Sequence, residues 1–292
     1  MNHAQLRAFH AVAEAGGFTA AANRLGLTQP AVTLQVRALE EAFRVELFHR
    51  RGRQVLLTDI GTALFALTRR LFATEEEARE LLEDAGGLAR GHLRVAADGP
   101  YFVIGLIAAF RARHPGIEIS VAIGNSRQAR QSLLDYAADV AVLATASGDA
   151  RFLELPYGRK EVVMVVPTRH PWARRKSVRL GELAGQKLIL REPGSSTRRA
   201  FEEALAAAGI TPEIALEIGS REAVREAVAA GLGLGVVLRE EFGHDERLRP
   251  IPFADAEVFT EEHVVCLKER AGNRAIAAFL ALLGHGSPGR IG

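Results

Sequence analysis

The stretch FTAAANRLGLTQPAVTLQVRALEEAF, residues Phe18 to Phe43, decides how the N-terminal end of this chain folds. It contains two helical patterns on either side of Gly26. We expect Thr19 to cap the first helix and Thr28 the second, because a threonine hydroxyl can accept a hydrogen bond from a first-turn N–H group. Pro30 then falls in a first turn, where its missing N–H removes no internal hydrogen bond. The stretch therefore predicts two short helices joined by a tight turn.

The second of these helices has an apolar side and a polar side. Helical spacing places four apolar residues together: Val32, Val36, Leu39 and Phe43. Another side carries Gln29, Thr33 and Arg37, whose side chains can bond base edges in the major groove while the helix N-terminus meets a phosphate. A helix face that simply contacts water has a similar composition, so the neighbouring segments must decide between these interpretations.

The segments on both sides favour a DNA-binding domain. A preceding helical pattern runs through Leu6, Phe9, Val12 and Ala13 to the glycines at 16 and 17. The following segment, ELFHRRGRQVLLTDIG (46–61), predicts two short strands joined by a tip with Arg50, Arg51 and Arg53. Such a tip can contact phosphates and add salt-dependent affinity with little sequence information, although an ordinary solvated turn can also carry three arginines. Its position directly after the helix pair favours a wing.

Net charge supports this assignment weakly. Residues 1–58 contain seven Arg, no Lys or Asp, and four Glu, a net charge of 7 − 4 = +3. The whole chain is +2, which leaves 2 − 3 = −1 for the remainder. The basic excess therefore belongs to the N-terminal fifth, as expected for an end that faces nucleic acid.

A long helix is expected next, capped by Thr58. Its apolar residues recur at helical intervals as Ile60, Leu64, Leu67, Leu71, Ala78, Leu81 and Leu82, and Gly86 and Gly87 end it. At ~1.5 Å per residue it would reach about 40 Å, more than a compact domain needs. We therefore expect this stripe to pair with a second subunit, which would let two DNA-binding heads read two half-sites.

Composition sets the broad class of protein. With 292 residues, 48% hydrophobic and 25% charged, the chain is expected to be soluble, globular and divided into two or three domains. No apolar run approaches the ~18 residues of a membrane span and no secretory signal is recognisable, so we expect a cytoplasmic protein that does not contact membranes. The single cysteine, Cys266, excludes an intrachain disulfide and is expected to be a buried, inert strand residue.

After residue 90 the pattern alternates between strands and helices. Strand-like runs at 92–97, 117–124, 139–144 and 161–167 are separated by helical segments, and a second such round follows. This alternation predicts an α/β fold with two similar lobes, each a parallel sheet with helices on its faces.

A ligand of such a fold lies beyond the C-terminal ends of the strands, where the next helices begin. The expected junctions carry Asp98, Gly99, Pro100, Tyr101, Asn125, Ser126, Thr145, Ser195, Ser196, Thr197, Arg198, Ser220 and Arg221. Hydroxyls, Arg and helix N-termini favour a small polar or anionic ligand. Each of the Ser, Thr, Asp and Asn residues is also an ordinary N-cap, which remains the alternative for any one of them.

Residues 18–61 resemble the winged helix-turn-helix of the LysR-type transcriptional regulators. The shared features are an Ala-Ala pair, Thr-Gln-Pro-Ala-Val-Thr, Leu-Glu, Leu-Phe and Arg-Arg, with Thr33 at a place where Ser is commoner. The resemblance implies that one helix faces DNA through Thr28, Gln29, Pro30, Thr33 and Arg37, and that Arg50, Arg51 and Arg53 form the wing. It also implies an effector domain like a two-lobed periplasmic binding protein, with crossings near Glu161 and Glu262.

The resemblance further implies the domain organisation and partners. We expect a DNA-binding domain at 1–58, a linker and dimerisation helix at 59–89, and an effector domain at 90–292. Lobe I would span about 90–161 and 263–292, and lobe II about 162–262. The expected partners are a double-stranded DNA operator, a small-molecule effector and further copies of the chain, as a dimer or a homotetramer, in a bacterial cell. No cofactor or metal is expected.

A narrower resemblance concerns the effector. Residues 101–126, 190–210 and 217–237 are similar to LysR-type regulators associated with aminoethylphosphonate catabolism. That similarity implies a phosphonate effector such as 2-aminoethylphosphonate, with Asp98 pairing with its amine.

Two other classes of function compete with a ligand-responsive regulator. An enzyme with a DNA-binding appendage finds little support, because no Gly-x-Ser-x-Gly or His-Glu-x-x-His motif is present and the nine His are scattered. The run GLGLGVV (231–237) follows a helix and precedes a strand, the reverse of a nucleotide-binding turn. An effector-independent DNA-binding protein would not need the two lobes. We therefore expect no enzymatic activity.

Overall fold

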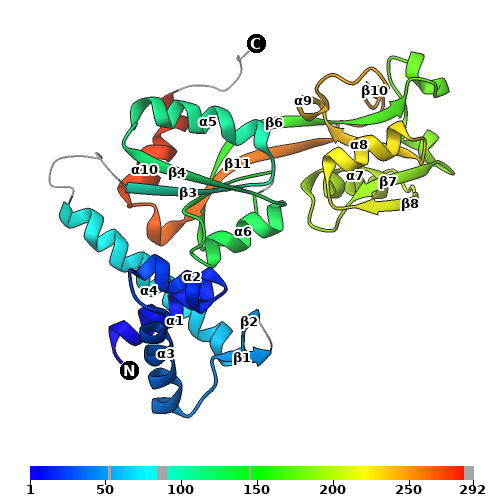
Figure 1. The fold of residues 1–292 in the computed structure, drawn as a ribbon. Coiled ribbons are helices and arrows are strands. Elements are labelled where there is room, and N and C mark those ends of the chain that lie inside the picture. The colour runs from blue at the N-terminus through cyan, green and yellow to red at the C-terminus, as the bar shows by residue number, and fades with distance from the viewer. Residues whose placement is uncertain (52–53, 84–90, 145, 286–292) are drawn as a thin grey trace. The chain divides into compact units, whose positions relative to one another are not determined.

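The computed structural model describes residues 1–51, 54–83, 91–144 and 146–285 (Figure 1). The chain divides into two compact units. The first holds Met1–Gly86 with Asp135–Ala137, and the second holds Gly87–Leu134 with Ala138–Gly292.

The first unit begins with three helices and a hairpin. The helices are α1 (His3–Ala15), α2 (Phe18–Leu25) and α3 (Gln29–Phe43), and the hairpin strands are β1 (Phe48–Arg51) and β2 (Gln54–Leu57). Asn2 caps α1, and the Thr28 hydroxyl accepts from Ala31 N at 3.4 Å to cap α3, as predicted. The core of this unit includes Phe9, Val12, Val32, Val36 and Leu39.

Two local expectations for this unit are wrong. Thr19 lies inside α2, whose N-cap is Gly17, because the helix starts at Phe18, two residues earlier than expected. The Phe18 ring packs edge-on against Phe48, with centroids 5.7 Å apart, so the first residue of the helix joins the core. Phe43 is 54% exposed because it is the last residue of α3, one turn beyond the last buried residue, Leu39.

The hairpin is antiparallel, with Phe48 opposite Leu57 and Arg51 opposite Gln54. The predicted pair of short strands is therefore confirmed. Arg53, at the predicted tip, lies outside the described residues, as do the side chains of Arg50 and Arg51.

Helix α4 (Asp59–Glu83) closes the first unit, and Thr58 caps it by accepting from Gly61 N at 2.9 Å. One side contributes Phe65 and Leu64 to the core, while His10 of α1 packs against Phe65 and Phe72. Four large apolar residues of this helix are exposed: Ile60, Leu67, Leu71 and Leu82. The predicted apolar stripe thus divides into a part that packs within the unit and a part open to a partner. The predicted end at Gly86 and Gly87 lies outside the described residues.

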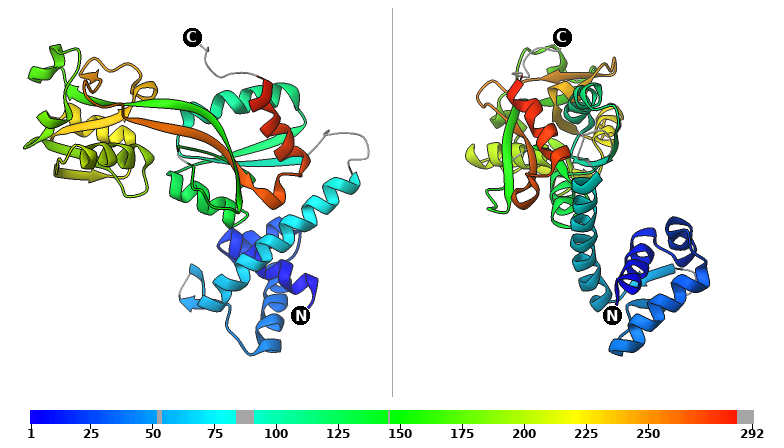
Figure 2. Two further views of the ribbon diagram at one scale, coloured as in Figure 1. Left: turned by 180° about the vertical axis from the view of Figure 1, so that it is seen from behind. Right: turned by 90° about the vertical axis from the view of Figure 1, so that its left-hand side faces the viewer.

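The second unit is built on a hydrogen-bonded sheet in which strands alternate with helices (Figures 1 and 2). The path runs β4-β3-β5-β11-β6-β9-β7-β8, with β10 also paired to β6. The strands are β3 (Gly91–Ala97), β4 (Ile117–Ile123), β5 (Val140–Ala144), β6 (Phe152–Pro167), β7 (Lys187–Arg191), β8 (Glu213–Ile218), β9 (Leu234–Leu238), β10 (Leu248–Ile251) and β11 (Phe259–Leu267). The helices are α5 (Pro100–Arg113), α6 (Ser126–Leu134), α7 (Ser196–Ala207), α8 (Arg221–Ala229), α9 (Arg239–Phe242) and α10 (Arg274–Ala281).

Strands β6 and β11 connect two lobes (Figure 2, left). Along β6, residues 152–161 pair with β11, and the pairing passes to β9 at Val162, next to the expected crossing at Glu161. The pairs β3–β4, β3–β5, β7–β8 and β7–β9 are parallel. β11 also pairs antiparallel with β5, and α10 contacts β3, so the end of the chain returns to the first lobe.

Apolar side chains between the sheet and its helices stabilise this unit. The larger core includes Phe110, Phe201 and Phe279. Gly235 lets α8 approach β9, since a Cβ there would lie 2.8 Å from Val224 Cγ1. Cys266 is buried on β11, and burial raises the pKa of its thiol to about 11, so the expected buried strand position is confirmed. Among the helices that the structure describes, none combines the length and apolarity needed to cross a bilayer.

Candidate functional site

The polar side of α3 presents the residues predicted to face DNA. Gln29, Pro30 and Arg37 are exposed, and Thr33 is half-buried. Thr33 Oγ1 donates to the Gln29 main-chain oxygen at 2.9 Å, and Gln29 Nε2 lies 3.4 Å from that hydroxyl. Arg37 makes no hydrogen bond or ion pair with the described residues. The helix thus offers an amide, a hydroxyl and a guanidinium along one side, next to the Thr28 cap.

The second unit contains a small pocket between its lobes. Its lining residues come from strand ends, helix starts and α9: Asp98, Asn125, Ser126, Arg191, Ser195, Ser196, Thr197, Arg221, Leu238 and Glu241. Seven of these are predicted site residues, so the structure brings together most of the junctions that the sequence singles out.

The lobe I side is formed at the ends of β3 and β4. Asp98 is buried, and its Oδ2 accepts from Ser126 Oγ and, at 2.8 Å, from Ala144 N. Burial raises the pKa of this carboxyl, while the Ser126 hydrogen bond opposes the rise. Asn125 caps α6 by accepting from Gln128 N at 2.9 Å. The expected contact of Asp98 with a ligand amine would compete with these existing hydrogen bonds.

The lobe II side contains the first turn of α7 and the start of α8. Ser195 caps α7 by accepting from Arg198 N at 3.5 Å, and Ser196 and Thr197 are buried in the turn that follows. Arg221 is the first residue of α8. Free N–H groups at such helix starts carry partial positive charge, which suits an anion.

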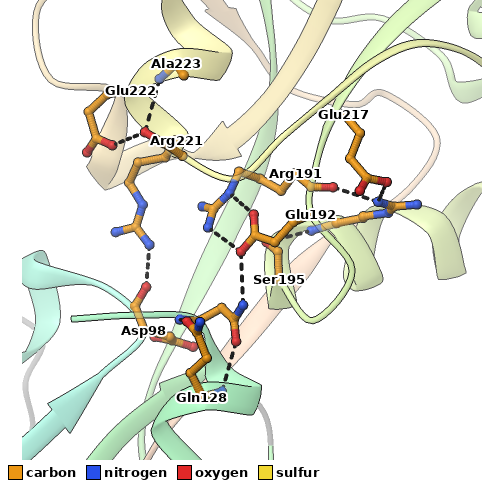
Figure 3. Close-up of polar contacts among 12 residues, drawn as sticks. Asp98, Gln128, Arg191, Glu192, Ser195, Glu217, Arg221, Glu222 and Ala223 are labelled. Carbon is orange, nitrogen blue, oxygen red and sulfur yellow. Dashed lines mark hydrogen bonds and ion pairs between the residues drawn. The ribbon is translucent and has the colours of Figure 1, made fainter. Parts of the chain in front are cut away.

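Two guanidinium groups complete the positive part of the pocket (Figure 3). Arg191, the last residue of β7, is paired with its neighbour Glu192 through Nε to Oε2 at 2.8 Å and Nη2 to Oε1 at 3.0 Å. Arg221 Nη1 lies 2.9 Å from Glu241 Oε1. Burial raises the pKa of Glu241 to about 7, although Arg221 partly offsets this.

The two lobes also contact each other across the pocket. Arg221 Nη2 of lobe II donates to the main-chain oxygen of Asp98 in lobe I, as Figure 3 shows. Asn125 Nδ2 of lobe I donates to Glu192 Oε1 of lobe II at 3.2 Å. A ligand that binds Arg221 or Asn125 therefore acts on groups that join the lobes.

Other predicted effector residues are not among those that line the pocket. Tyr101 is 50% exposed on α5, where Pro100 is the first residue. Arg198 pairs with Glu202 and Glu217, and Ser220 caps α8. Gly99 lies directly behind the pocket, because a Cβ there would be 2.9 Å from Arg221 Nη1 and 3.0 Å from Glu241 Oε1. Thr145 lies outside the described residues.

Three residues of the pocket were not predicted from the sequence: Arg191, Leu238 and Glu241. Arg191 ends the strand before the PGSS turn, and Leu238 ends the strand before REEF. Leu238 also lies where a strand ends and a helix begins, at the junction of β9 with α9, and Glu241 follows three residues later. The expectation that ligands lie at strand-to-helix junctions therefore applies to this pair as well. Within the described ranges, no group of three or more His, Cys, Asp or Glu side chains is arranged to hold a metal ion.

The fold, the polar side of α3 and the pocket between the lobes define a class of protein: a winged helix-turn-helix joined to an α/β ligand-binding domain. Comparison with known families agrees with that class. Residues 3–62 match the bacterial regulatory helix-turn-helix protein family of lysR type, and residues 86–287 match the LysR substrate binding domain. The chain belongs to the LysR family of transcriptional regulators.

Individual proteins show the same relationship. The chain is 34% identical, over 92% of its length and 90% of the other protein, to the RuBisCO operon transcriptional regulator of Allochromatium vinosum. Full-length CbnR in complex with its target DNA has the same fold, with a TM-score of 0.72, 24% identity, and coverage of 98% of this chain and 99% of that one. The regulatory domain of Synechocystis PCC6803 CcmR in complex with 2-PG also shares the fold, with a TM-score of 0.63, 24% identity, and coverage of 68% and 99%.

The general function follows from the family. The chain is a DNA-binding transcriptional regulator with an effector-binding domain, and it acts on operator DNA rather than as an enzyme. Its partners are DNA and a small-molecule effector.

Proposed function

We propose that the pocket between the lobes binds a small organic anion, and that this anion is the signal to which the regulator responds. The observation that carries the proposal is the meeting of Arg191 and Arg221 with the starts of α6 and α7 at one buried pocket. Guanidinium groups and free helix N–H groups together stabilise oxyanions through charge-assisted hydrogen bonds. A phosphonate, phosphate or carboxylate group fits this set of donors.

Among small organic anions, 2-aminoethylphosphonate is the specific effector that the sequence resemblance implies. The three proteins named above do not carry phosphonates in their names, whereas one of them was solved with 2-PG. We therefore propose 2-PG as an equal candidate for testing, since both compounds would present an anionic group to Arg191 and Arg221.

On the DNA side, we propose that Thr28, Gln29, Pro30, Thr33 and Arg37 contact the operator, and that Arg50, Arg51 and Arg53 contact its phosphates. The exposed positions of Gln29 and Arg37 on α3 support the first part. The proposed organisation is a DNA-binding domain at 1–58, a linker helix at 59–89 and an effector domain at 90–292. Because the regulator reads the cell's DNA, we place it in the cytoplasm.

Coupling between the two functions requires that the anion bind one arrangement of the lobes more tightly than another, since equal affinity would shift no equilibrium. The contacts from Arg221 to Asp98 and from Asn125 to Glu192 supply groups that an anion would engage differently in the two arrangements. Activation and repression are both compatible with this coupling.

The test is thermal unfolding and calorimetric titration of the full chain with 2-aminoethylphosphonate, 2-PG and sulfate. Ethanolamine, which has the amine but no anionic group, is the control ligand. A ligand at ~100 times its Kd should stabilise the native state by about 2.7 kcal/mol, which raises Tm. Arg221→Gln should weaken anion binding by about tenfold or more, because charge-assisted hydrogen bonds contribute ~1.5–3 kcal/mol.

The matched control variant is Arg169→Gln, an exposed arginine of the second lobe that does not line the pocket. It should leave the Kd unchanged. Equal binding of ethanolamine and the anions, or full affinity in Arg221→Gln, would show that the pocket does not recognise an anionic group.

A further inference from the structure

The charges that line the pocket cancel when all its side chains are ionised. Arg191 and Arg221 are cationic, and Asp98 and Glu241 are anionic. In addition, Arg191 is already held in two hydrogen bonds by Glu192. An anion that entered this pocket would meet no net positive charge, so uptake of a proton by one of the pocket carboxyls would favour its binding.

Arg221 and Glu241 show which charge can change. Nη1 of Arg221 lies 2.9 Å from Glu241 Oε1, but this buried nitrogen has no hydrogen-bond partner among the described residues. The backbone at Gly99 closes the space on the lobe I side, where even a methyl group would contact both side chains. Arg221 and Glu241 are therefore held close together and attract each other by charge, but Nη1 of Arg221 makes no hydrogen bond with the described residues.

A third carboxyl lies close enough to influence this pair. Glu262 on β11 is fully buried, and its side chain accepts from Thr260 Oγ1 at 3.1 Å. Its Oε2 has no hydrogen-bond partner within the described part of the chain. A buried carboxylate with an unpaired oxygen loses free energy of hydration when it is ionised, which favours its protonated form. We therefore expect a proton to be shared readily among Asp98, Glu241 and Glu262.

We propose that an anion enters the pocket together with one proton, which comes from solvent and is taken up by the carboxyl of Glu241. This inference rests on the proposed anion-binding function. The proton forms an O–H bond on a Glu241 oxygen, and no other covalent bond changes. Glu241 then no longer neutralises Arg221, whose Nη1 is available to the anion, and the new O–H group is a second donor.

The surroundings of Glu241 are consistent with this role. Arg221 and Arg191 favour its ionised form, whereas Asp98, Glu222 and Glu262 oppose it. On β6, which packs against α9, the charged groups are already paired, since Lys160 lies 3.5 Å from Glu240 and Glu161 lies 2.5 Å from Arg239. β9, also packed against α9, contributes only apolar residues and glycine.

The raised pKa values of Glu241 and Glu262 agree with their burial and with their closeness to other carboxyls. Burial raises the pKa of Glu241 to about 7 and that of Glu262 to about 8, with Asp98 adding to both shifts. A bound anion adds negative charge and engages Arg221, and both effects raise the pKa of Glu241 further. Near neutral pH, binding therefore draws in a proton, and affinity falls as pH rises through the pKa of free Glu241.

Sulfate is the probe, because its charge does not change between about pH 6 and pH 8.5. An ordinary glutamate, with a pKa of ~4.3, also stays ionised in this range, so a pH dependence of binding must come from a perturbed group. We expect the Kd for sulfate to rise about tenfold over this range, which corresponds to a shift of about one pKa unit on binding. Calorimetry near neutral pH in two buffers of different ionisation enthalpy gives the number of protons taken up directly, and needs no variant. We expect a value between zero and one, and clearly above zero.

Glu241→Gln should bind sulfate with a Kd that changes clearly less with pH, and with less proton uptake, than the wild-type chain. Glu222→Gln is the matched control, because this neighbouring carboxyl has a lowered pKa, so the control should keep the pH dependence of the wild-type chain. Sulfate binding with no pH dependence and no proton uptake would overturn this inference and leave the anion pocket intact. A chain that binds none of the anions at any pH would overturn both.

Discussion

Arg198 Nη1 donates a hydrogen bond of 2.7 Å to the main-chain oxygen of Arg191. The first of these arginines lies outside the pocket and the second lines it. Arg198 is also paired with Glu202 at 2.8 Å and Glu217 at 2.7 Å. We therefore propose that Arg198 is a positioning residue that fixes the end of β7 against α7, rather than the direct ligand contact that the sequence suggested.

We predict that Arg198→Ala destabilises the second unit by about 1–2 kcal/mol, because it leaves the Arg191 carbonyl without its charged donor. Anion affinity should fall only a few-fold, through displacement of Arg191. Chemical denaturation and calorimetry measure the two effects. Arg199→Ala is the control, since Arg199 is exposed and lies 3.9 Å from its partner Glu203. Loss of binding without loss of stability would instead make Arg198 a ligand contact.

Asp139 joins two arginines at the other end of the strands. It accepts from Arg94 N at 2.7 Å, from Arg94 Nη2 at 2.6 Å and from Arg270 Nη1 at 2.6 Å. Asp139→Asn should cost about 3–5 kcal/mol of unfolding free energy, because it removes the carboxylate that pairs with Arg94 and with the buried Arg270. Asp149→Asn is the control for loss of a partly exposed carboxylate and should have a much smaller effect on Tm.

Stability should also depend on pH through Asp139. Burial acts to raise the pKa of this carboxyl, but the hydrogen bonds and charge of Arg94, with the charge of Arg270, outweigh burial and lower the pKa. A lowered folded-state pKa means that the stabilisation is present above the unfolded pKa of ~3.9 and is lost as pH falls below it. We expect the Tm of the wild-type chain to drop more steeply than that of Asp139→Asn between about pH 5 and pH 3. Parallel curves would contradict this assignment.

The wing prediction concerns salt dependence. Arg50→Ala with Arg51→Ala should weaken binding to all duplexes and reduce the slope of log K against log salt by about 2, if each arginine neutralises one phosphate. Fluorescence anisotropy with a selected operator and a random duplex measures both. The control removes Arg111 and Arg113, two exposed arginines of α5. An unchanged slope in the wing variant would exclude phosphate contacts there.

The exposed side of α4 predicts self-association. Leu67→Asn with Leu71→Asn should shift the chain to smaller species at micromolar concentration, because burying a leucine contributes ~1.5–3 kcal/mol per side chain. Sedimentation velocity measures the shift. Leu34→Asn is the matched control, since Leu34 and Leu67 are each 67% exposed. The same species distribution in the α4 variant and the wild-type chain would place the main interface elsewhere.

The helices and strands could largely be predicted from the sequence, because capping residues and the spacing of apolar residues depend only on neighbours along the chain. Thr28 and Thr58 cap the helices assigned to them, and Val32, Val36 and Leu39 are buried together on α3. Thr19 and Phe43 were assigned wrongly. In each case the outcome depended on packing at a helix end, which spacing along the chain does not reveal.

The candidate site was predictable only in part, and for a related reason. The rule that ligands lie at strand-to-helix junctions found Asp98, Ser126, Ser196 and Arg221, since their places follow from strand direction. It did not distinguish a junction residue that lines the pocket from one that supports it, as Arg198 does. It also passed over Arg191 and Glu241, which lie on a strand and on a short helix.

By itself, the sequence determined that a winged helix-turn-helix precedes an α/β domain with polar strand ends, because capping, helical spacing and strand alternation depend on neighbours within a few residues. Only the tertiary structure decided that Arg221 donates to the backbone of Asp98, 123 residues away in the chain, and that Glu241 is buried beside it. Charge and desolvation depend on which side chains meet in space, and that is settled by how the lobes pack.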